Sequence, residues 1–405
     1  MPLHGSSSGE SQTATDPVRT EMLPYGAQWI EDDDIAAVVE VLKSSWLTTG
    51  PKVDELEYEF AKAVEADYAV AVTNGTAALH AAVYALGIGP GDEVIVPSIT
   101  FVASANCVAY QGATPVFADV VAESLLVDPE QIENMITAKT KAVVAVDFAG
   151  QPCDYDAICG IAKRHGLYVL ADACHAIGGA YKGKPVGSLA DLNTFSFHPV
   201  KHITTGEGGM ITTADPDFAG RMRTFRNHGI DTDHRQRAKS NTFAYEMTDL
   251  GYNYRLSDIQ CALGISQLRK LMPWVKRRQE IATRYDEAFA KMPAVRPLTN
   301  ADDVSNAYHL YVIRLDLRLL NVSRDVIFED LRAEGIGVNV HYAPVHTQPY
   351  YREHFGTGPG QCPVAEAVYQ EILSLPMFPK MSNSDVDDVV RAVDKVLALR
   401  SESKS

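Results

Sequence analysis

Paired cysteines are missing from this sequence. None of its cysteines belongs to a Cys-x-x-Cys pair; they are Cys107, Cys153, Cys159, Cys174, Cys261 and Cys362. Most of them lie in apolar stretches, which is typical of reduced, buried thiols in a cytoplasmic protein. We therefore expect neither a disulfide framework nor a zinc site, and no other metal centre.

Long apolar runs and an excess of positive charge are missing as well. No apolar run approaches the roughly 20 residues that a membrane-spanning helix needs. The chain contains 36 Lys and Arg against 52 Asp and Glu, which gives a formal net charge of −16. Such a surface repels nucleic-acid phosphates and anionic membranes, so we expect neither as a partner. An anionic substrate must then be held by local basic groups or by backbone N–H groups.

The N-terminal segment lacks an apolar core. Residues 1–22 are rich in Ser, Thr and Gly, which is typical of a disordered leader and not of a signal peptide. Together with the missing membrane span, this segment leads us to expect a cytoplasmic protein. The 405 residues are 46% hydrophobic and 22% charged, an ordinary composition for a globular protein of about two domains.

What the sequence does contain, up to residue 213, is an alternation of short β-rich runs and helical patterns. Continuous apolar strands separated by helices predict a parallel sheet that is covered on both faces. The expected strands are 68–72, 93–96, 114–118, 141–147, 167–171, 192–197 and 209–213. The expected helices are 32–44, 53–65, 76–87, 101–110, 129–136 and 155–165.

The pattern changes after a long helical segment at 256–290. The later elements are expected strands at 308–315 and 337–341 and expected helices at 323–334, 362–372 and 384–399. They predict a second, smaller α+β unit. We therefore expect a large domain with an N-terminal arm over residues 23–275 and a small C-terminal domain over residues 276–405.

Lys201 lies in the segment 195–209, FSFHPVKHITTGEGG. The expected strand ends at Phe197, so Lys201 falls in the turn that follows, and a glycine-rich stretch leads into the next strand. A lysine held in tight, irregular backbone at a strand end is well placed to bond covalently with a carbonyl carbon. A single loop lysine is more often merely solvated, so this interpretation depends on other segments.

Asp172 ends the apolar strand in the run 167–176, LYVLADACHA. An acidic residue at the carboxyl end of a buried parallel strand lies where open α/β sheets bind ligands. A carboxylate there can keep a pyridinium nitrogen protonated, which makes a cofactor ring an electron sink. The alternative is that Asp172 caps the next helix, and the residue types leave both interpretations open.

Two further segments carry weaker signals. The run 72–79, VTNGTAAL, combines a strand, a turn and a helix start, so Gly75 and Thr76 could offer N–H groups to a phosphate. An Asn-Gly pair by itself more often marks a simple turn. Phe101 follows the strand 93–96, where an aromatic ring is more often core than the cover of a flat cofactor.

The order of these segments carries a family resemblance. Along the chain come NGT, PSITFVASAN, LADACHA, FSFHPVKHITTGEGG and LGYNYRLSDIQCALG. This order, from about residue 22 to residue 400, resembles the DegT/DnrJ/EryC1/StrS family of sugar aminotransferases. The resemblance implies an α/β fold of the aspartate aminotransferase type (fold type I), with a large, mostly parallel-sheet domain and a smaller C-terminal α+β domain. It also implies a homodimer with shared active sites.

The resemblance implies an enzyme that depends on pyridoxal 5′-phosphate (PLP) and passes through pyridoxamine phosphate. Lys201 would bind PLP covalently and move protons, and Asp172 would hold the ring nitrogen. The other implied cofactor contacts are Gly75, Thr76 and Ser196 at the phosphate, Phe101 on the ring, His175 beside the phenolic oxygen, and Asn253 at the phosphate of the other subunit. Many members have Gln or Glu at the position of His175.

Within the family, the closest resemblance is to the pseudaminic acid pathway aminotransferase. It rests on VDFAG at 146–150, on His175, on the HPVK lead into Lys201 and on VHYAP at 340–344. It implies amino transfer from L-glutamate to the 4-keto carbon of UDP-2-acetamido-2,6-dideoxy-β-L-arabino-hex-4-ulose. The implied substrate contacts are Tyr25, Ser45, Trp46, Leu47, Thr48, His341 and Tyr342. Tyr25 and Trp46 could equally anchor the N-terminal arm, and VHYAP could be only a strand-to-loop junction.

Several alternatives remain at the level of sequence. A GDP-perosamine or dTDP-sugar aminotransferase would differ only in its acceptor. A sugar 3-dehydrase of the same family has His in place of the lysine, whereas here Lys201 is present and His202 follows it. A non-catalytic PLP-binding regulator would not need Lys201 and Asp172. A cysteine desulfurase would need a mobile cysteine loop near the C-terminus, for which Cys362 is a poor candidate.

Overall fold

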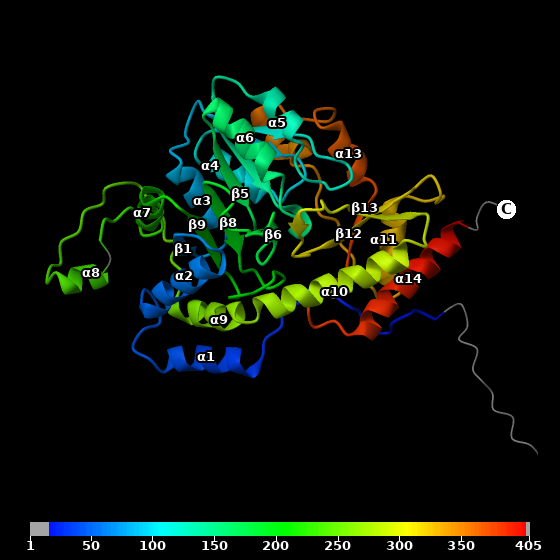
Figure 1. The fold of residues 1–405 in the computed structure, drawn as a ribbon, viewed down its shortest axis with the longest axis horizontal. Coiled ribbons are helices and arrows are strands. Elements are labelled where there is room, and N and C mark those ends of the chain that lie inside the picture. The colour runs from blue at the N-terminus through cyan, green and yellow to red at the C-terminus, as the bar shows by residue number, and fades with distance from the viewer. Residues whose placement is uncertain (1–15, 233, 402–405) are drawn as a thin grey trace, which may run out of the picture.

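The central element of the fold is a seven-stranded sheet with helices on both faces (Figure 1). The computed structural model describes residues 16–232 and 234–401. The strand order is β1-β9-β8-β5-β4-β2-β3. The strands are β1 (Tyr68–Val72), β2 (Glu93–Pro97), β3 (Thr114–Ala118), β4 (Thr140–Val146), β5 (Tyr168–Asp172), β8 (Leu192–Ser196) and β9 (Gly209–Thr213). Between them lie α3 (Gly75–Ala85), α4 (Ala103–Tyr110), α5 (Pro129–Met135), α6 (Tyr155–His165) and the strand pair β6 (Ala180–Tyr181) and β7 (Lys184–Pro185).

The sheet is mostly parallel, which confirms the expected α/β class. The pairs β3·β2, β2·β4, β4·β5 and β5·β8 are all parallel. β9 is antiparallel to both of its neighbours, β1 and β8. The strands are continuous apolar runs because helices bury both faces; in β4, only Lys141 is exposed. The carboxyl ends of β2, β4, β5 and β8 therefore meet at one edge of the sheet.

A smaller sheet follows, in the order β10-β12-β13. Its strands are β10 (Val295–Pro297), β12 (Tyr311–Leu315) and β13 (Ile372–Leu375), and the pairing is antiparallel. The long helix α10 (Leu271–Phe289) runs from below the large sheet to this unit, where α11 (Arg324–Ala333) and α14 (Asn383–Ser401) lie (Figure 1). The helices α12 (Pro349–Phe355) and α13 (Pro363–Tyr369) and the short strand β11 (Val304–Ser305) complete the C-terminal part.

Three expected elements differ from the structure. The helical segment 256–290 is broken into α9 (Asp258–Leu268) and α10, because Pro273 lacks the N–H that a continuous helix would need there. Residues 337–341 form no strand but one isolated bridge, Asn339 to Ser374. β12 pairs instead with β13, which begins at the last residue of the expected helix 362–372 and continues beyond it.

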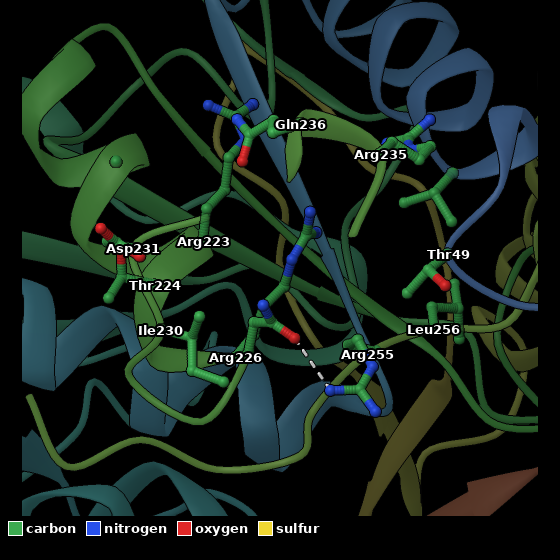
Figure 2. A pocket seen from close by; sticks show the side chains of 13 residues that line it. Thr49, Arg223, Thr224, Arg226, Ile230, Asp231, Arg235, Gln236, Arg255 and Leu256 are labelled. Atoms are coloured by element: carbon green, nitrogen blue, oxygen red, sulfur yellow. Dashed lines mark hydrogen bonds between the residues drawn. The ribbon is translucent and has the colours of Figure 1, made fainter. Parts of the chain in front are cut away.

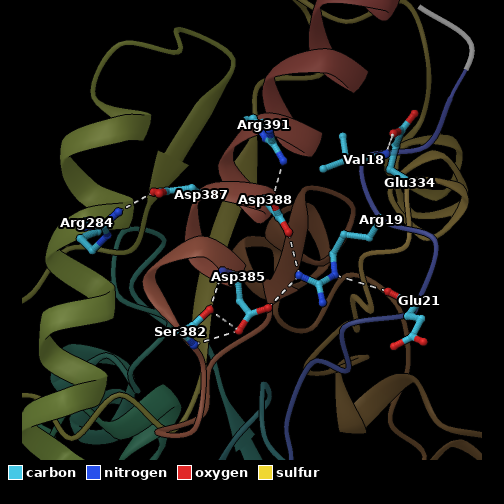
Figure 3. Close-up of polar contacts among 10 residues, drawn as sticks. All are labelled: Val18, Arg19, Glu21, Arg284, Glu334, Ser382, Asp385, Asp387, Asp388 and Arg391. Carbon is cyan, nitrogen blue, oxygen red and sulfur yellow. Dashed lines mark hydrogen bonds and ion pairs between the residues drawn. The ribbon is translucent and has the colours of Figure 1, made fainter. Parts of the chain in front are cut away.

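The segment before Leu23 packs against the C-terminal part, as Figure 3 shows. Arg19 Nη1 lies 2.7 Å from a carboxylate oxygen of Asp385 and 2.7 Å from one of Asp388. The N–H of Arg19 donates to the carbonyl of Glu334. The sequence led us to expect disorder up to residue 22. These contacts differ from that expectation, because the Arg19 guanidinium pairs with two carboxylates of α14. Residues 1–15 of the expected leader lie outside the described residues.

Asp258 joins α9 to the segment that precedes α2 (Pro51–Ala63), while α1 (Asp32–Leu42) packs below α9 (Figure 1). Asp258 is fully buried. Its two carboxylate oxygens accept from Gly50 N (2.7 Å) and Lys52 N (2.9 Å), so they cap the first turn of α2. Gly50 is required because a Cβ there would lie 2.5 Å from the Asp258 carboxylate.

We expect Asp258→Ala to lower the free energy of unfolding by about 2 kcal/mol, because it leaves the buried N–H of Gly50 and the partly buried N–H of Lys52 without acceptors. Chemical denaturation measures the loss. Asp54→Ala is the matched control: Asp54 is an exposed member of α2 paired with Arg235, so its loss should change stability by less than about 0.5 kcal/mol. Equal effects of the two substitutions would contradict the capping role.

Candidate active site

A cavity of about 570 Å³ opens where the carboxyl ends of β5 and β8 meet the first turn of α3. It lies between the large sheet and the segment 339–342 of the C-terminal part. The structure brings together here ten of the residues expected at the site, which are Tyr25, Gly75, Thr76, Phe101, Asp172, His175, Ser196, Lys201, His341 and Tyr342. Residues far apart in sequence therefore share one cavity at the edge where parallel sheets bind ligands.

Lys201 lies in the connection between β8 and β9. The two strands are antiparallel, with Ser196 opposite Gly209, and the N–H of Phe197 donates to the carbonyl of Gly208 at 2.8 Å. Lys201 N donates to the carbonyl of His198 at 2.9 Å, which closes a tight bend. The lysine is therefore held by a closed loop at the strand ends.

The glycines of the GEGG run allow this loop to approach α3. A Cβ on Gly209 would lie 2.5 Å from the carbonyl oxygen of Asn74, and one on Gly208 would lie 2.1 Å from Thr205 Oγ1. Asn74 caps α3, since its side chain accepts from Ala77 N at 2.8 Å. The glycines thus let the lysine loop lie directly against the start of α3.

The amine of Lys201 is set in an environment that disfavours its charge. Burial lowers the pKa of Lys201 to about 8, Arg278 adds to the lowering, and the Asp172 carboxylate opposes it. Nζ has a neighbour at 3.3 Å, the Nε2 atom of His309. An amine with this pKa is neutral, and so available as a base, in about half of the molecules at pH 8.

Histidines gather around this amine. Burial, and then the charge of Lys201, keep the pKa values of His175 and His309 well below the ordinary value. The ring centroids of these two residues lie 4.4 Å apart. Burial, and then Lys201, lower the pKa of His341 to about 4. The cavity wall near Lys201 therefore consists of neutral imidazoles, which makes it a polar surface without positive charge.

His309 was not among the residues expected from the sequence. It lies just before β12, and its carbonyl oxygen accepts from Arg278 Nη1 at 3.3 Å. Arg278 is fully buried in α10 and also binds the carbonyls of Tyr308 and Met377. A polar residue directly ahead of an apolar strand is the only signal the sequence offered. The approach of His309 to Lys201 depends on tertiary packing.

Asp172 ends β5 with its carboxylate buried at the cavity floor. Its Oδ2 accepts from Ser104 Oγ at 2.6 Å, and its Oδ1 from Cys174 N at 3.3 Å. Residues 173–178 form turns and no α-helix, so the alternative role as a helix cap is not observed. Ser104 lies in the first turn of α4. Like His309, it was not among the residues expected from the sequence.

The first turn of α3 offers an anion site at the other end of the cavity. The first N–H groups of a helix have no partner within the helix and attract negative charge. Gly75 is the first residue of α3, and a Cβ there would lie 2.9 Å from Ser196 Cβ and 3.3 Å from Cys174 Sγ. The glycine thus lets Ser196 and the helix end face one small space.

Aromatic rings line the entrance. Phe101 is 54% exposed, and its centroid lies 5.9 Å from that of Tyr342. The hydroxyl of Tyr342 lies 3.3 Å from His175 Nε2, and burial raises the pKa of that hydroxyl. The Tyr25 ring lies 5.5 Å from that of His341. These rings can cover a flat ligand and leave a hydroxyl facing it.

Five expected residues do not line the cavity of their own chain. They are Ser45, Trp46, Leu47, Thr48 and Asn253. Thr48 forms a bridge with Ser257, and Asn253 forms one with Asn227. Because Ser257 follows Asn253 by only a few residues, both groups belong to one neighbouring face, outside the cavity.

That face borders a second cavity, of about 290 Å³, shown in Figure 2. Four arginine side chains line it: Arg223, Arg226, Arg235 and Arg255. Arg223 and Arg226 both bind the Glu57 carboxylate, and Arg255 donates to the Asn227 side chain at 2.9 Å. Two carboxylates of the chain therefore pair with three of these guanidinium groups, Glu57 with Arg223 and Arg226 and Asp54 with Arg235.

The residues behind the other sequence alternatives lie outside the main cavity. His202 is buried, and its Nε2 lies 2.9 Å from the carbonyl oxygen of Ala307. Cys362 is fully buried, next to the carbonyl oxygen of Phe117. All six cysteines are free. Over residues 16–232 and 234–401, no His, Cys, Asp and Glu side chains form a metal-binding group, and no helix suits a bilayer span.

Known proteins resemble this chain in sequence and in fold. A model of the DegT/DnrJ/EryC1/StrS aminotransferase family matches residues 28–394. The spore coat polysaccharide biosynthesis protein SpsC of Bacillus subtilis is 45% identical over 381 residues, 94% of this chain and 98% of SpsC.

Two solved structures have the same fold. Spr1654 of Streptococcus pneumoniae, described as a sugar aminotransferase and solved in its PMP form, is 32% identical with a TM-score of 0.88, covering 93% of this chain and 99% of Spr1654. PseC of Helicobacter pylori, an aminotransferase of pseudaminic acid biosynthesis, is 32% identical with a TM-score of 0.87, covering 94% and 100%. The present chain therefore belongs to the DegT/DnrJ/EryC1/StrS aminotransferase family.

Proposed function

We propose that this aminotransferase moves an amino group from L-glutamate to the 4-keto carbon of a nucleotide-linked sugar, with PLP bound to Lys201. The position of the Lys201 amine carries the proposal. It lies in the main cavity with a pKa lowered to about 8. Asp172 and the first turn of α3 line the same cavity. The relatives SpsC, Spr1654 and PseC support a sugar as acceptor.

The residues of the cavity fit PLP. Gly75 keeps open a space beside Ser196 that a Cβ would fill, at a helix end suited to a phosphate. His175 Nδ1 is buried and has no hydrogen-bond partner among the described residues, so a ligand oxygen can supply one. Phe101 is exposed toward the space between these groups, where it can stack on a ring.

When bound, PLP supplies a ring that takes up the electron pair left as the α-carbon of the donor loses its proton. Asp172 would hold the proton of the ring nitrogen. Lys201 Nζ, as a neutral amine, would accept the proton from the α-carbon of the donor and, as the ammonium, would give it up again later in the reaction. The N–H groups of α3 and Ser196 would hold the phosphate, so that the cofactor would keep its place while Lys201 moves protons. Keto acid and amino sugar exchange through the same cavity.

We further propose a homodimer with shared sites. Asn253 and the segment Ser45–Thr48 share a face outside their own cavity, which suits residues that complete the cavity of a partner. Large apolar side chains are exposed on the adjoining arm that carries α8 (His234–Lys239) in Figure 1: Phe243 is 93% exposed and Leu250 is 69% exposed. Such exposed apolar surface is typical of a contact between subunits.

For the acceptor, we propose UDP-2-acetamido-2,6-dideoxy-β-L-arabino-hex-4-ulose, the sugar of the pseudaminic acid pathway. Three side chains lie together at the cavity wall: His175, Tyr342 and His341. The sequence resemblance to this branch rests in part on His175 and on the VHYAP segment, which contains His341. Similarity to PseC supports it. SpsC, at 45% identity, supports the wider class of polysaccharide sugars, so GDP- and dTDP-linked 4-keto sugars are the alternatives.

We expect PLP to attach to Lys201 at a rate that rises with pH and levels off above about pH 8. Only the neutral amine attacks, and its fraction rises as pH increases through the pKa of about 8. Stopped-flow absorbance after PLP is mixed with the apoenzyme measures the rate. Borohydride reduction and peptide mass spectrometry should locate the cofactor on Lys201, and Lys201→Ala should carry none. Labelling of another lysine would overturn the assignment.

Shared sites predict that two inactive variants restore each other. In a hybrid of Lys201→Ala and Asn253→Ala subunits, one site receives both defects and the other receives neither. Mixing the unfolded variants and refolding them together should recover up to about a quarter of wild-type activity, because half of the dimers are hybrids with one intact site. If each site is built from one chain, the mixture stays as inactive as its components.

The acceptor is tested by direct comparison with glutamate as donor. We expect the UDP-linked 2-acetamido-4-keto sugar to be aminated at least about tenfold faster than GDP- or dTDP-linked 4-keto sugars, because unpaired polar groups in the site penalise the wrong acceptor. Steady-state kcat/KM gives the ratio. A faster GDP or dTDP sugar would replace the acceptor and leave the aminotransferase proposal intact.

A further inference from the structure

A chain of hydroxyl groups leads to the carboxylate of Asp172. Thr100 Oγ1 lies 2.7 Å from Ser104 Oγ, and Ser104 Oγ lies 2.6 Å from Asp172 Oδ2. Thr100 is 2% exposed and Ser104 is 0% exposed. Distances this short, away from water, are typical of hydrogen bonds to a charged acceptor.

The direction of this chain follows from the groups themselves. An ionised carboxylate can only accept, so Ser104 must donate its single O–H to Asp172. Ser104 Oγ then has only lone pairs left for Thr100, which must donate to it. Each O–H points toward Asp172, so the hydroxyl that binds the carboxylate is itself held in place by a second hydroxyl. Cys174 N supports the other oxygen at 3.3 Å.

The position of Ser104 argues against a merely local role. A serine in a helix usually bonds its hydroxyl to the backbone of its own helix. Here both hydrogen-bond partners of the hydroxyl are side chains, and Asp172 lies in a different element, strand β5. The backbone N–H of Ser104 already donates to the carbonyl of Phe101 at 3.1 Å. The hydroxyl is therefore aimed at the carboxylate.

The segment 100–104 also carries Phe101, the ring expected to stack on the cofactor. One short segment thus places an aromatic face in the cavity and a donated hydrogen bond behind Asp172. A change in its backbone would move both groups together. The two carboxylate oxygens differ in their contacts: Oδ2 accepts the short bond from Ser104, and Oδ1 accepts the longer one from Cys174 N.

We propose that Ser104, supported by Thr100, is a positioning residue that holds the Asp172 carboxylate directed at the cofactor, so that the ring nitrogen retains its proton. This inference rests on the proposed function, since it concerns the same cofactor. Without the hydroxyl, the carboxylate is no longer held against the ring nitrogen, which then loses the partner that keeps its proton in place. The ring then accepts electrons less well.

The test uses the holoenzyme loaded with PLP that carries ¹⁵N in its ring. The ¹⁵N chemical shift reports directly whether the ring nitrogen is protonated. In Ser104→Ala we expect the resonance to move toward that of neutral pyridine. We also expect the rate of the first half-reaction with glutamate to fall about tenfold, the effect of losing one hydrogen bond to a charged group.

Three variants make the result specific. Ser104→Thr keeps the hydroxyl and should restore the wild-type shift, whereas Thr100→Val should give an intermediate shift. Ser98→Ala is the matched control: Ser98 is equally buried in the same connection, but its hydroxyl pairs with His346. It should leave the ¹⁵N resonance in place. Asp172→Asn marks the limit, since an amide cannot hold the proton on nitrogen.

The outcomes separate the two proposals. If the wild-type protein takes up no labelled PLP, the proposed function falls, and this inference falls with it. If the wild type shows a protonated nitrogen and Ser104→Ala shows the same resonance, the positioning role is wrong and the proposed function stands. A shift in Ser98→Ala equal to that in Ser104→Ala would also overturn it, because any buried serine would then have the effect.

Discussion

The site depends on one physical constraint, a lysine amine buried beside neutral imidazoles and a buried arginine. Desolvation lowers the pKa of Lys201 to about 8, and the same desolvation keeps the nearby histidines uncharged. Burial also lowers the pKa of Arg278 to about 9. Arg278 binds carbonyl oxygens from the segments before β12 and after β13. The group that holds the C-terminal unit together thus also disfavours charge on the lysine.

The fold supplies this constraint through its layers. Parallel strands end at one edge, and their loops bring Phe101, Asp172 and Lys201 to it. The C-terminal unit then covers that edge with His309 and His341. The large unit carries the amine at a sheet edge that faces outward, and the small unit supplies the residues that cover it. Burial of Lys201 is a property of the two units packed together.

The sequence predicted best what depends on local pattern. The bounds of β1, β3 and β9 agree with the apolar runs, because strands buried on both faces are continuous in sequence. The sequence missed β13, a short apolar run that follows a helix directly.

Within the site, the residues at strand ends came from the family resemblance and local pattern together. Ser104 lay inside the quoted PSITFVASAN motif, yet its bond to Asp172 joins helix α4 to strand β5 and has no sequence signature. His309 reaches Lys201 only through the packing of the C-terminal unit. The segment Ser45–Thr48 lies off the cavity because it pairs with the segment that follows Asn253.

The antiparallel position of β9 has a consequence for how this enzyme can change. The connection that carries Lys201 begins and ends in the paired residues Ser196 and Gly209, and Gly209 touches the turn at Asn74. An inserted residue could not slide along either strand, because a one-residue slip would reverse the faces of two buried strands. The register of the two strands therefore fixes the two points from which the connection that carries Lys201 is held at the cavity.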